Sequence, residues 1–295
     1  MKNFSRILVA LDRSPMDSYL IGIARRVSDL FGASKVYFVH IIPDLGLSKS
    51  ARAEFQKRFE AGIPIDEQVK ALLQEEIQTH WGPGGTAEWS LDVPEGKPFE
   101  KLLHWQEVKQ IDLLIIGQKS KSLGSGITAR KLANQSRCHV LFVPETSKSM
   151  GKRILVPVDF SEDSAKALKL ALQWKSMDEE VQVTAFHVTD LLATGYYLNR
   201  QEFENFNRFL ADTAKDSFRE FLKENQIPEN SLEVVILRND EGKTSERILE
   251  YARENGFDWI IAGAQGHGAI ERFFFGSVTE KLVSQALPAP TLVVR

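Results

Sequence analysis

Runs of β-branched and aliphatic residues alternate along the chain with stretches in which apolar residues follow a helical period. The short runs are typical of buried strands, and the helical period is typical of amphipathic helices. In the C-terminal half, the pattern predicts strands near 153–158, 181–188, 232–237, 258–263 and 291–294. It predicts helices near 162–175, 200–225, 244–255 and 277–287. Strands that alternate with helices in this way favour βαβ units, in which helices cover both faces of a parallel sheet.

Three positions refine the boundaries of the predicted helices. Ser161 lies where an N-cap belongs, directly before the helix near 162–175. Gly256 follows the helix near 244–255 and predicts a left-handed residue that ends it. In the N-terminal half, the long second helix is interrupted at 62–64, because Pro64 prevents a straight continuation.

The opening segment of the chain occurs twice, at 6–14 (RILVALDRS) and at 153–161 (RILVPVDFS). The same register relates 37–40 to 184–187, 112–117 to 258–263, and Lys131-Leu132 to Lys281-Leu282. A repeat this long indicates a duplicated domain, since solenoid units have periods of about 20–50 residues. The sequence therefore predicts two α/β domains, 1–146 and 152–295, joined by the polar stretch 145–152.

Composition narrows the class of protein. A hydrophobic content of 43% and a charged content of 26% are ordinary for a soluble globular protein. The net charge of −3 and the absence of a basic stripe argue against nucleic acid as a partner. The N-terminal apolar run stops at Asp12, too short for a signal peptide or a membrane span, so we expect a cytoplasmic protein. The single cysteine, Cys138, cannot form an internal disulfide and is predicted to be buried.

Candidate chemistry lies in a glycine-rich segment, 263–279, that follows the predicted strand near 258–263. Gly263, Gly266 and Gly276 have the spacing G-x-x-G-x9-G-S, and Ser277 begins a helical pattern. Backbone N–H groups exposed by glycines, together with a helix N-terminus, suit a polyphosphate. The alternative is a long loop in which the glycines only serve turns. Asp159 and Val188 also fall at predicted strand ends, where open parallel sheets bind ligands.

These motifs resemble those of the universal stress protein family. The resemblance is carried by I-L-V-x-x-D-x-S at the start of each copy, by His187-Val188 after the second strand, and by the glycine spacing. It extends over about 4–144 and 152–295, and it implies the tandem form of the family. It also implies two five-stranded parallel-sheet domains of the adenine-nucleotide-hydrolase-like, Rossmann-like type. In the family, single domains pair through their last strands, so 140–143 and 291–294 would join the two copies as an internal pseudo-dimer.

The resemblance implies an ATP site, with Mg²⁺, in the C-terminal copy. Asp159 would contact the adenosine end, Pro157, Val158 and Val188 would line the adenine, and the glycine segment would surround the ribose and phosphates. The implied binding residues are Pro157, Val158, Asp159, Val188, Ala262, Gly263, Gly266, His267, Gly276, Ser277, Val278 and Thr279. Asp159 has an alternative role, because a carboxylate there could instead cap the following helix. Whether His267 approaches phosphate also stays open.

The N-terminal copy departs from the glycine pattern. Ser120 stands where the second glycine belongs, Ile127 replaces the serine after Gly126, and the loop from Gly117 is shorter than its counterpart. We therefore predict one nucleotide site per chain, in the C-terminal copy. Asp12 remains, so a smaller ligand such as a nucleoside stays open for the first copy.

Catalytic motifs are absent from the sequence: there is no G-x-S-x-G elbow, no H-E-x-x-H helix and no Walker lysine. A dedicated enzyme is therefore not expected, although slow hydrolysis of bound ATP stays open. His40 and His187 lack metal spacing and are expected to be hydrogen-bonded strand-end histidines. The function expected is regulatory adenine-nucleotide binding in a stress response. A homodimer and an unidentified protein partner stay open, and the alternative is an interaction scaffold without nucleotide.

Overall fold

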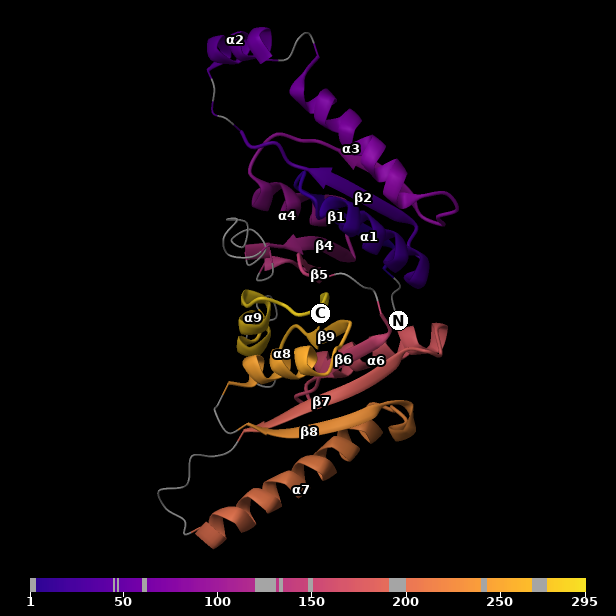
Figure 1. The fold of residues 1–295 in the computed structure, drawn as a ribbon, viewed down its shortest axis with the longest axis vertical. Coiled ribbons are helices and arrows are strands. Elements are labelled where there is room, and N and C mark those ends of the chain that lie inside the picture. The colour runs from indigo at the N-terminus through magenta and orange to yellow at the C-terminus, as the bar shows by residue number, and fades with distance from the viewer. Residues whose placement is uncertain are drawn as a thin grey trace. The chain divides into compact units, whose positions relative to one another are not determined.

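The computed structural model describes residues 4–44, 46, 48–59, 63–119, 131–132, 135–147, 151–190, 200–239, 243–266 and 275–295 (Figure 1). The chain divides into two compact units, Met1–Glu145 and Thr146–Arg295. Each unit is an α/β structure with its own parallel sheet. The predicted pairing of the two last strands concerns the relative placement of the units and stays a prediction.

The first unit has the strand order β3-β2-β1-β4-β5, and each neighbouring pair is parallel. Its strands are β1 (Arg6–Leu11), β2 (Lys35–His40), β3 (Glu88–Asp92), β4 (Leu113–Gln118) and β5 (His139–Pro144). Its labelled helices are α1 (Asp17–Phe31), α2 (Lys49–Phe59), α3 (Ile65–Trp81) and α4 (Pro98–Val108). The break predicted at Pro64 is confirmed, because this proline precedes the first residue of α3.

The second unit repeats this arrangement, with the order β10-β9-β6-β7-β8 and parallel pairs throughout. Its strands are β6 (Arg153–Pro157), β7 (Gln182–Asp190), β8 (Glu233–Asn239), β9 (Trp259–Gly263) and β10 (Thr291–Val294). Its helices are α6 (Glu162–Met177), α7 (Arg200–Glu224), α8 (Thr244–Glu254) and α9 (Ser277–Ser284), with a 3₁₀ turn at Glu229–Ser231. The predicted alternation of strands and helices is confirmed in this unit.

Helix ends in the second unit follow local sequence. The hydroxyl of Ser161 accepts a hydrogen bond from the N–H of Ser164 and caps α6, as predicted. Gly256 has φ 62°, the left-handed conformation expected after α8. By contrast, α9 ends at Ser284, earlier than the predicted limit at 287, and Gln285 is extended. Pro288 and Pro290 follow closely, and proline disfavours helix in the residue before it.

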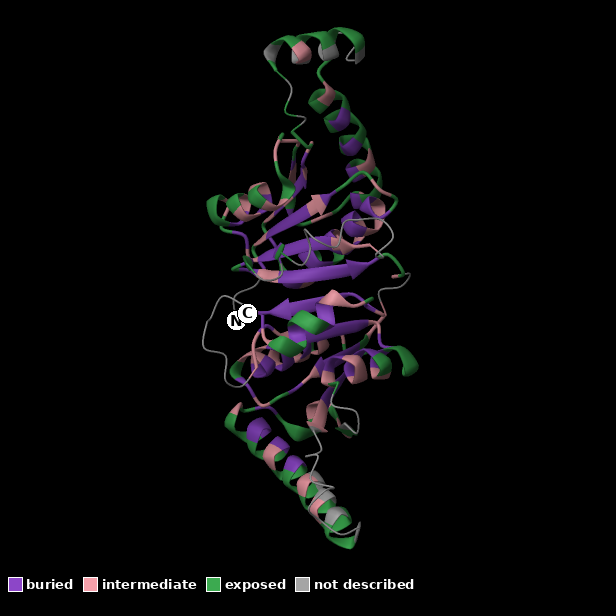
Figure 2. Cartoon of the chain, turned by 90° about the vertical axis from the view of Figure 1, so that its left-hand side faces the viewer, coloured by how far each residue is buried: buried purple, intermediate pink, exposed green. Residues whose placement is uncertain are grey.

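The core of each unit is formed by the inner strands of its sheet, which are largely buried, whereas the edge strands β3 and β8 are partly exposed (Figure 2). Ile7, Leu8 and Val9 of β1 are fully buried, and so are Ile154 and Leu155 of β6. Consecutive buried residues identify strands covered by helices on both sides, which explains why these runs are continuous rather than alternating. Cys138 is buried, as predicted. None of the helices in the described ranges is both long and apolar enough to cross a membrane.

Candidate functional site

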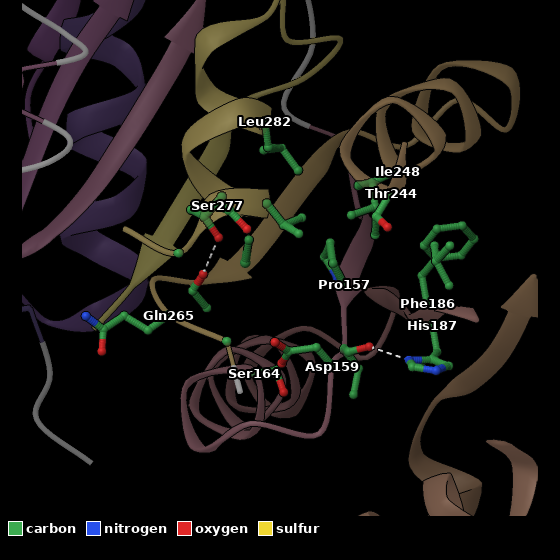
Figure 3. A pocket seen from close by; sticks show the side chains of 18 residues that line it. Pro157, Asp159, Ser164, Phe186, His187, Thr244, Ile248, Gln265, Ser277 and Leu282 are labelled. Atoms are coloured by element: carbon green, nitrogen blue, oxygen red, sulfur yellow. Dashed lines mark hydrogen bonds between the residues drawn. The ribbon is translucent and has the colours of Figure 1, made fainter. Parts of the chain in front are cut away.

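A cavity of 410 Å³ lies at the carboxyl ends of the strands in the second unit. Its floor comes from the ends of β6, β7 and β9, and residues of α8 and α9 form its other walls (Figure 3). Strand order reverses between β6 and β9, since successive strands lie on opposite sides of this pair. Open parallel sheets bind ligands where the order reverses, and the cavity occupies that position.

The cavity brings together eleven of the twelve residues predicted to bind nucleotide. They are Pro157, Val158, Asp159, Val188, Ala262, Gly263, Gly266, Gly276, Ser277, Val278 and Thr279. The twelfth, His267, lies outside the described residues, as do Arg272 and Phe273 of the same segment. Residues that are far apart in sequence therefore share one cavity, although their contact with a ligand stays a prediction.

Two of the glycines lie in close contact with neighbouring segments. A Cβ atom on Gly263 would lie 2.7 Å from the backbone carbon of Asp163 and 2.8 Å from the nitrogen of Ser164. A Cβ on Gly266 would lie 2.3 Å from Oδ2 of Asp159. The contacts at Gly263 are with backbone atoms and leave no room for a side chain, whereas at Gly266 the end of the Asp159 side chain would have to move. The glycines therefore let the segment after β9 approach the start of α6 and the carboxylate that follows β6.

The third glycine begins α9. Gly276 is its N-cap, and since glycine has no side chain, the N-cap residue itself leaves the first N–H groups of the helix uncapped. The N–H of Gly276 donates to the carbonyl of Ala264 at 2.8 Å, and the Thr279 hydroxyl donates to the carbonyl of Gly263 at 2.8 Å. These two bonds fix the first turn of α9 against the end of β9. Ser277 is exposed, and the first residues of α9 line the cavity.

Asp159 has partners in its own loop. Its Oδ1 accepts hydrogen bonds from the Ser161 N–H at 3.2 Å and from the Ser161 hydroxyl at 2.6 Å. The cap of α6 is Ser161 itself, so Asp159 orients the capping residue rather than capping the helix directly. The second carboxylate oxygen, Oδ2, lies beside Gly266. The alternative role of Asp159, a direct cap of the helix, is therefore taken by Ser161, while the outer carboxylate oxygen borders the cavity.

His187 lines the cavity and is held by the backbone. Its Nδ1 lies 2.8 Å from the carbonyl oxygen of Val158, and since a carbonyl only accepts, Nδ1 carries the proton (Figure 3). Its ring packs on Phe160 with centroids 4.4 Å apart. The expectation of a hydrogen-bonded strand-end histidine is confirmed. The equivalent His40 of the first unit makes the same bond to Leu11 at 3.0 Å.

Comparison with known proteins identifies the family. The profile described as Universal stress protein family matches residues 3–144 and again 150–295. The chain belongs to the universal stress protein family. The two matches give it the tandem form, and the resemblance predicted from the motifs is confirmed.

Individual relatives agree with this assignment. The chain is similar to universal stress protein MJ0577 of Methanocaldococcus jannaschii, with 31% identity over 50% of this chain and 96% of that protein. It is 28% identical to universal stress protein YxiE of Bacillus subtilis, over 50% of this chain and all of that protein. A solved universal stress protein from Archaeoglobus fulgidus shares the fold, with TM-score 0.67, 17% identity and coverage of 100% and 99% of the two chains.

Both domains of this universal stress protein contain a cavity at the same place. The cavity of the first unit measures 350 Å³ and lies at the ends of β1, β2 and β4. Asp12, the counterpart of Asp159, pairs there with Lys119 at 2.5 Å. The sequence departures at Ser120, Gly126 and Ile127 lie outside the described residues.

Sequence reasoning missed several lining residues of the second unit. They are Ser164, Phe186, Thr244, Ile248, Gln265 and Leu282, together with His187, which was considered only as a structural residue. In a parallel sheet, helices begin at the same edge at which strands end, so the start of α8 at Thr244 was a usable signal. Gln265 lies between two of the predicted glycines and could have been included on spacing alone.

Metal ligands are sparse around the cavity. Among the described residues, no group of three or more His, Cys, Asp or Glu side chains could hold a metal ion. Asp159 is the single carboxylate among the described lining residues. Magnesium prefers phosphate oxygens and water with one or two carboxylates, so this donor set suits an ion carried by a nucleotide rather than a protein-held ion.

Proposed function

We propose that this universal stress protein binds ATP with Mg²⁺ in the cavity of its second domain. The observation that carries the proposal is the combination, in one cavity, of apolar strand ends with the uncapped N-terminus of α9. An apolar wall suits a flat base, and a helix N-terminus suits phosphate because its free N–H groups and dipole attract anions. We further propose that ATP occupancy regulates the protein's shape or its choice of partner in the cytoplasm during stress.

Each part of the nucleotide has a matching wall. Pro157, Val158 and Val188 would contact the adenine, with Ile248 of α8 on another side of the cavity. Asp159 would accept hydrogen bonds from the ribose or the base through its outer oxygen. The phosphates would lie at Gly266, Gly276 and Ser277, and His267 is predicted to lie near them. Magnesium would be held mainly by the phosphates, and the charge that it supplies would offset theirs.

A route for a conformational response leads from this cavity to α7. Phe160 directly follows Asp159 and has φ 66°, a backbone conformation that residues other than glycine rarely adopt. Its ring packs against His187 and, at 5.7 Å between centroids, against both Phe218 and Phe221 of α7. A ligand that moves the Asp159 loop would therefore act on the packing of α7.

The direct test is calorimetry and thermal unfolding of the full chain with MgATP. We expect one site per chain, and ATP at one hundred times its Kd should add about 2.7 kcal/mol to the unfolding free energy. Ser277→Asp should weaken ATP binding by at least about tenfold, because its charge repels phosphate while suiting a helix N-terminus. Protection of α7 in hydrogen exchange should change when ATP binds.

Two controls make this test specific. Ser277→Asn has nearly the same size as the aspartate and no charge, so it should bind ATP almost as the unchanged protein does. Adenosine lacks phosphates, so its binding should be insensitive to Ser277→Asp. Two equivalent sites, equal ATP affinity in the aspartate and asparagine variants, or unchanged melting with adenylates at millimolar levels would each contradict the proposal.

A further inference from the structure

The cavity of the first domain is built from the same positions as the ATP cavity proposed for the second, but its described walls are more apolar. Leu11, Leu20, Ile41, Leu102, Ile116 and Leu132 all line it. Thr244, at the start of α8, has Pro98 as its counterpart at the start of α4. The exchange replaces a hydroxyl with a ring that has no donor. A ligand in this cavity would therefore bury mostly hydrocarbon.

The two domains also differ in the contact that holds the segment after the fourth strand of the sheet. In the second domain, the carboxylate of Asp163 accepts a hydrogen bond from the N–H of Gln265 at 3.1 Å. The position equivalent to Asp163 is Met16, which is buried and lies against Gly117, 3.2 Å from where a Cβ would be. Met16 cannot hold the segment as the carboxylate does. Its flexible thioether instead gives the cavity a wall that adapts to an apolar ligand.

The charged end of the cavity is the pair of Lys119 and Asp12. The Lys119 side chain is 18% exposed, whereas that of Asp12 is 48% exposed, so the ammonium is the more enclosed partner. An ammonium has three N–H donors, and its bond to Asp12 needs one. Lys119 can therefore accommodate a second anionic oxygen while Asp12 stays largely hydrated.

His40 does not add a charge to this end at neutral pH. Its Nδ1 donates to the carbonyl of Leu11, and burial lowers the pKa of its ring below the usual 6.5. The described lining thus carries one cation and one anion. The ammonium, already paired with one carboxylate, has donors left for one more anionic group, and a monoanion supplies one.

We propose that the cavity of the first domain binds an aliphatic monocarboxylic acid, with its carboxylate at Lys119 and its chain among the leucine and isoleucine side chains. This inference goes beyond ATP binding by the second domain and does not depend on it. It assigns the first domain a ligand of its own, so that one chain would bind two chemically different small molecules.

The test is calorimetry in which sodium decanoate, below its micellar concentration, is titrated into the full chain. The titration is done without MgATP and again with saturating MgATP. We expect one decanoate per chain. Hexanoate and octanoate should bind more weakly, by about tenfold for each two methylene groups removed, because each methylene adds a fixed increment of burial. Binding that disappears when MgATP is added, or that ignores chain length, would overturn the proposal.

Two substitutions place the ligand. Lys119→Gln introduces the residue type found at Gln265 and should weaken decanoate binding about tenfold, while leaving 1-decanol binding unchanged because the alcohol has no charge. Ala10→Phe, at the end of β1, should abolish binding of both by filling the cavity. Thermal unfolding checks that each variant folds. If Ala10→Phe does not fold, Lys119→Gln and the chain-length series still test the proposal. Decanoate affinity that is unchanged in Lys119→Gln, or AMP binding that Lys119→Gln weakens, would refute the assignment.

Discussion

The two cavities occupy the same place in two copies of one fold and differ mainly in how their polar groups are used. In the second domain, Asp159 is held by Ser161, and the described lining of the cavity contains no lysine or arginine. In the first domain, Asp12 is paired with Lys119. The apolar strand ends are therefore shared by the two copies, whereas the polar and charged residues beside them differ.

The first turn of the first helix shows the same divergence. Ser164 of α6 donates its N–H to Ser161 and its hydroxyl to the carbonyl of the same residue. Its counterpart in α1 is Asp17, which is fully buried and accepts hydrogen bonds from the N–H groups of Asp12 and Arg13. A neutral hydroxyl in one copy is thus a buried carboxyl in the other, and the two copies should respond differently to pH.

The largest expected effect is the pH dependence due to Asp17. Burial raises its pKa from 3.8 to about 6, although the two backbone N–H groups oppose the shift. Between about pH 4 and 6, the folded protein therefore keeps a proton on Asp17 that the unfolded protein has released. The unfolding free energy should fall by about 3 kcal/mol as pH rises through that window. Urea unfolding of Asp17→Asn should lack this fall.

The matched control is Ser164→Ala in the second domain. It should shift the unfolding free energy by the same amount at every pH, because it removes no titrating group. A constant difference between Asp17→Asn and the unchanged protein from about pH 4 to 7 would show that Asp17 titrates normally.

The next effect compares two equivalent glycines. Gly263→Ala should destabilise the protein by about 2 kcal/mol, because its Cβ would meet the backbone at Asp163 and Ser164. Gly117→Ala should cost less than about 1 kcal/mol, because its Cβ would meet only the flexible side chains of Met16 and Leu20. Denaturant unfolding followed by tryptophan fluorescence measures both, and equal costs would mean that the close approach at Gly263 is wrong.

The smallest effect concerns two equivalent serines. Ser161→Ala should cost about 1 kcal/mol, because it removes the cap of α6 and a bond to Asp159. Ser14→Ala should be neutral or slightly stabilising, because the Ser14 hydroxyl is buried without a hydrogen-bond partner in the described part of the chain. The same unfolding measurement applies, and a clear loss in Ser14→Ala would reveal a partner for that hydroxyl.

Much of the second domain could be predicted because its signals are local. Apolar runs gave β6 through β10, Ser161 gave the start of α6, and Gly256 gave the stop after α8. The glycine spacing and the strand ends also predicted residues that share one cavity, because parallel strands end at a common edge.

Other features depend on residues that meet only in space. The sequence predicts a helix near 244–255, but that Thr244 and Ile248 line the cavity depends on how α8 packs on the sheet. The pairing of Lys119 with Asp12 likewise joins the ends of two strands that are neighbours only through the strand order.

The duplication, the parallel α/β class and the family could all be predicted from the sequence. Each follows from hydrophobic periodicity or from short motifs, which can be recognised without knowing any tertiary contact. The need for glycine at position 263 and the raised pKa of Asp17 are visible only in the folded structure. Close approach and burial are properties of distances between segments, and no single segment records them.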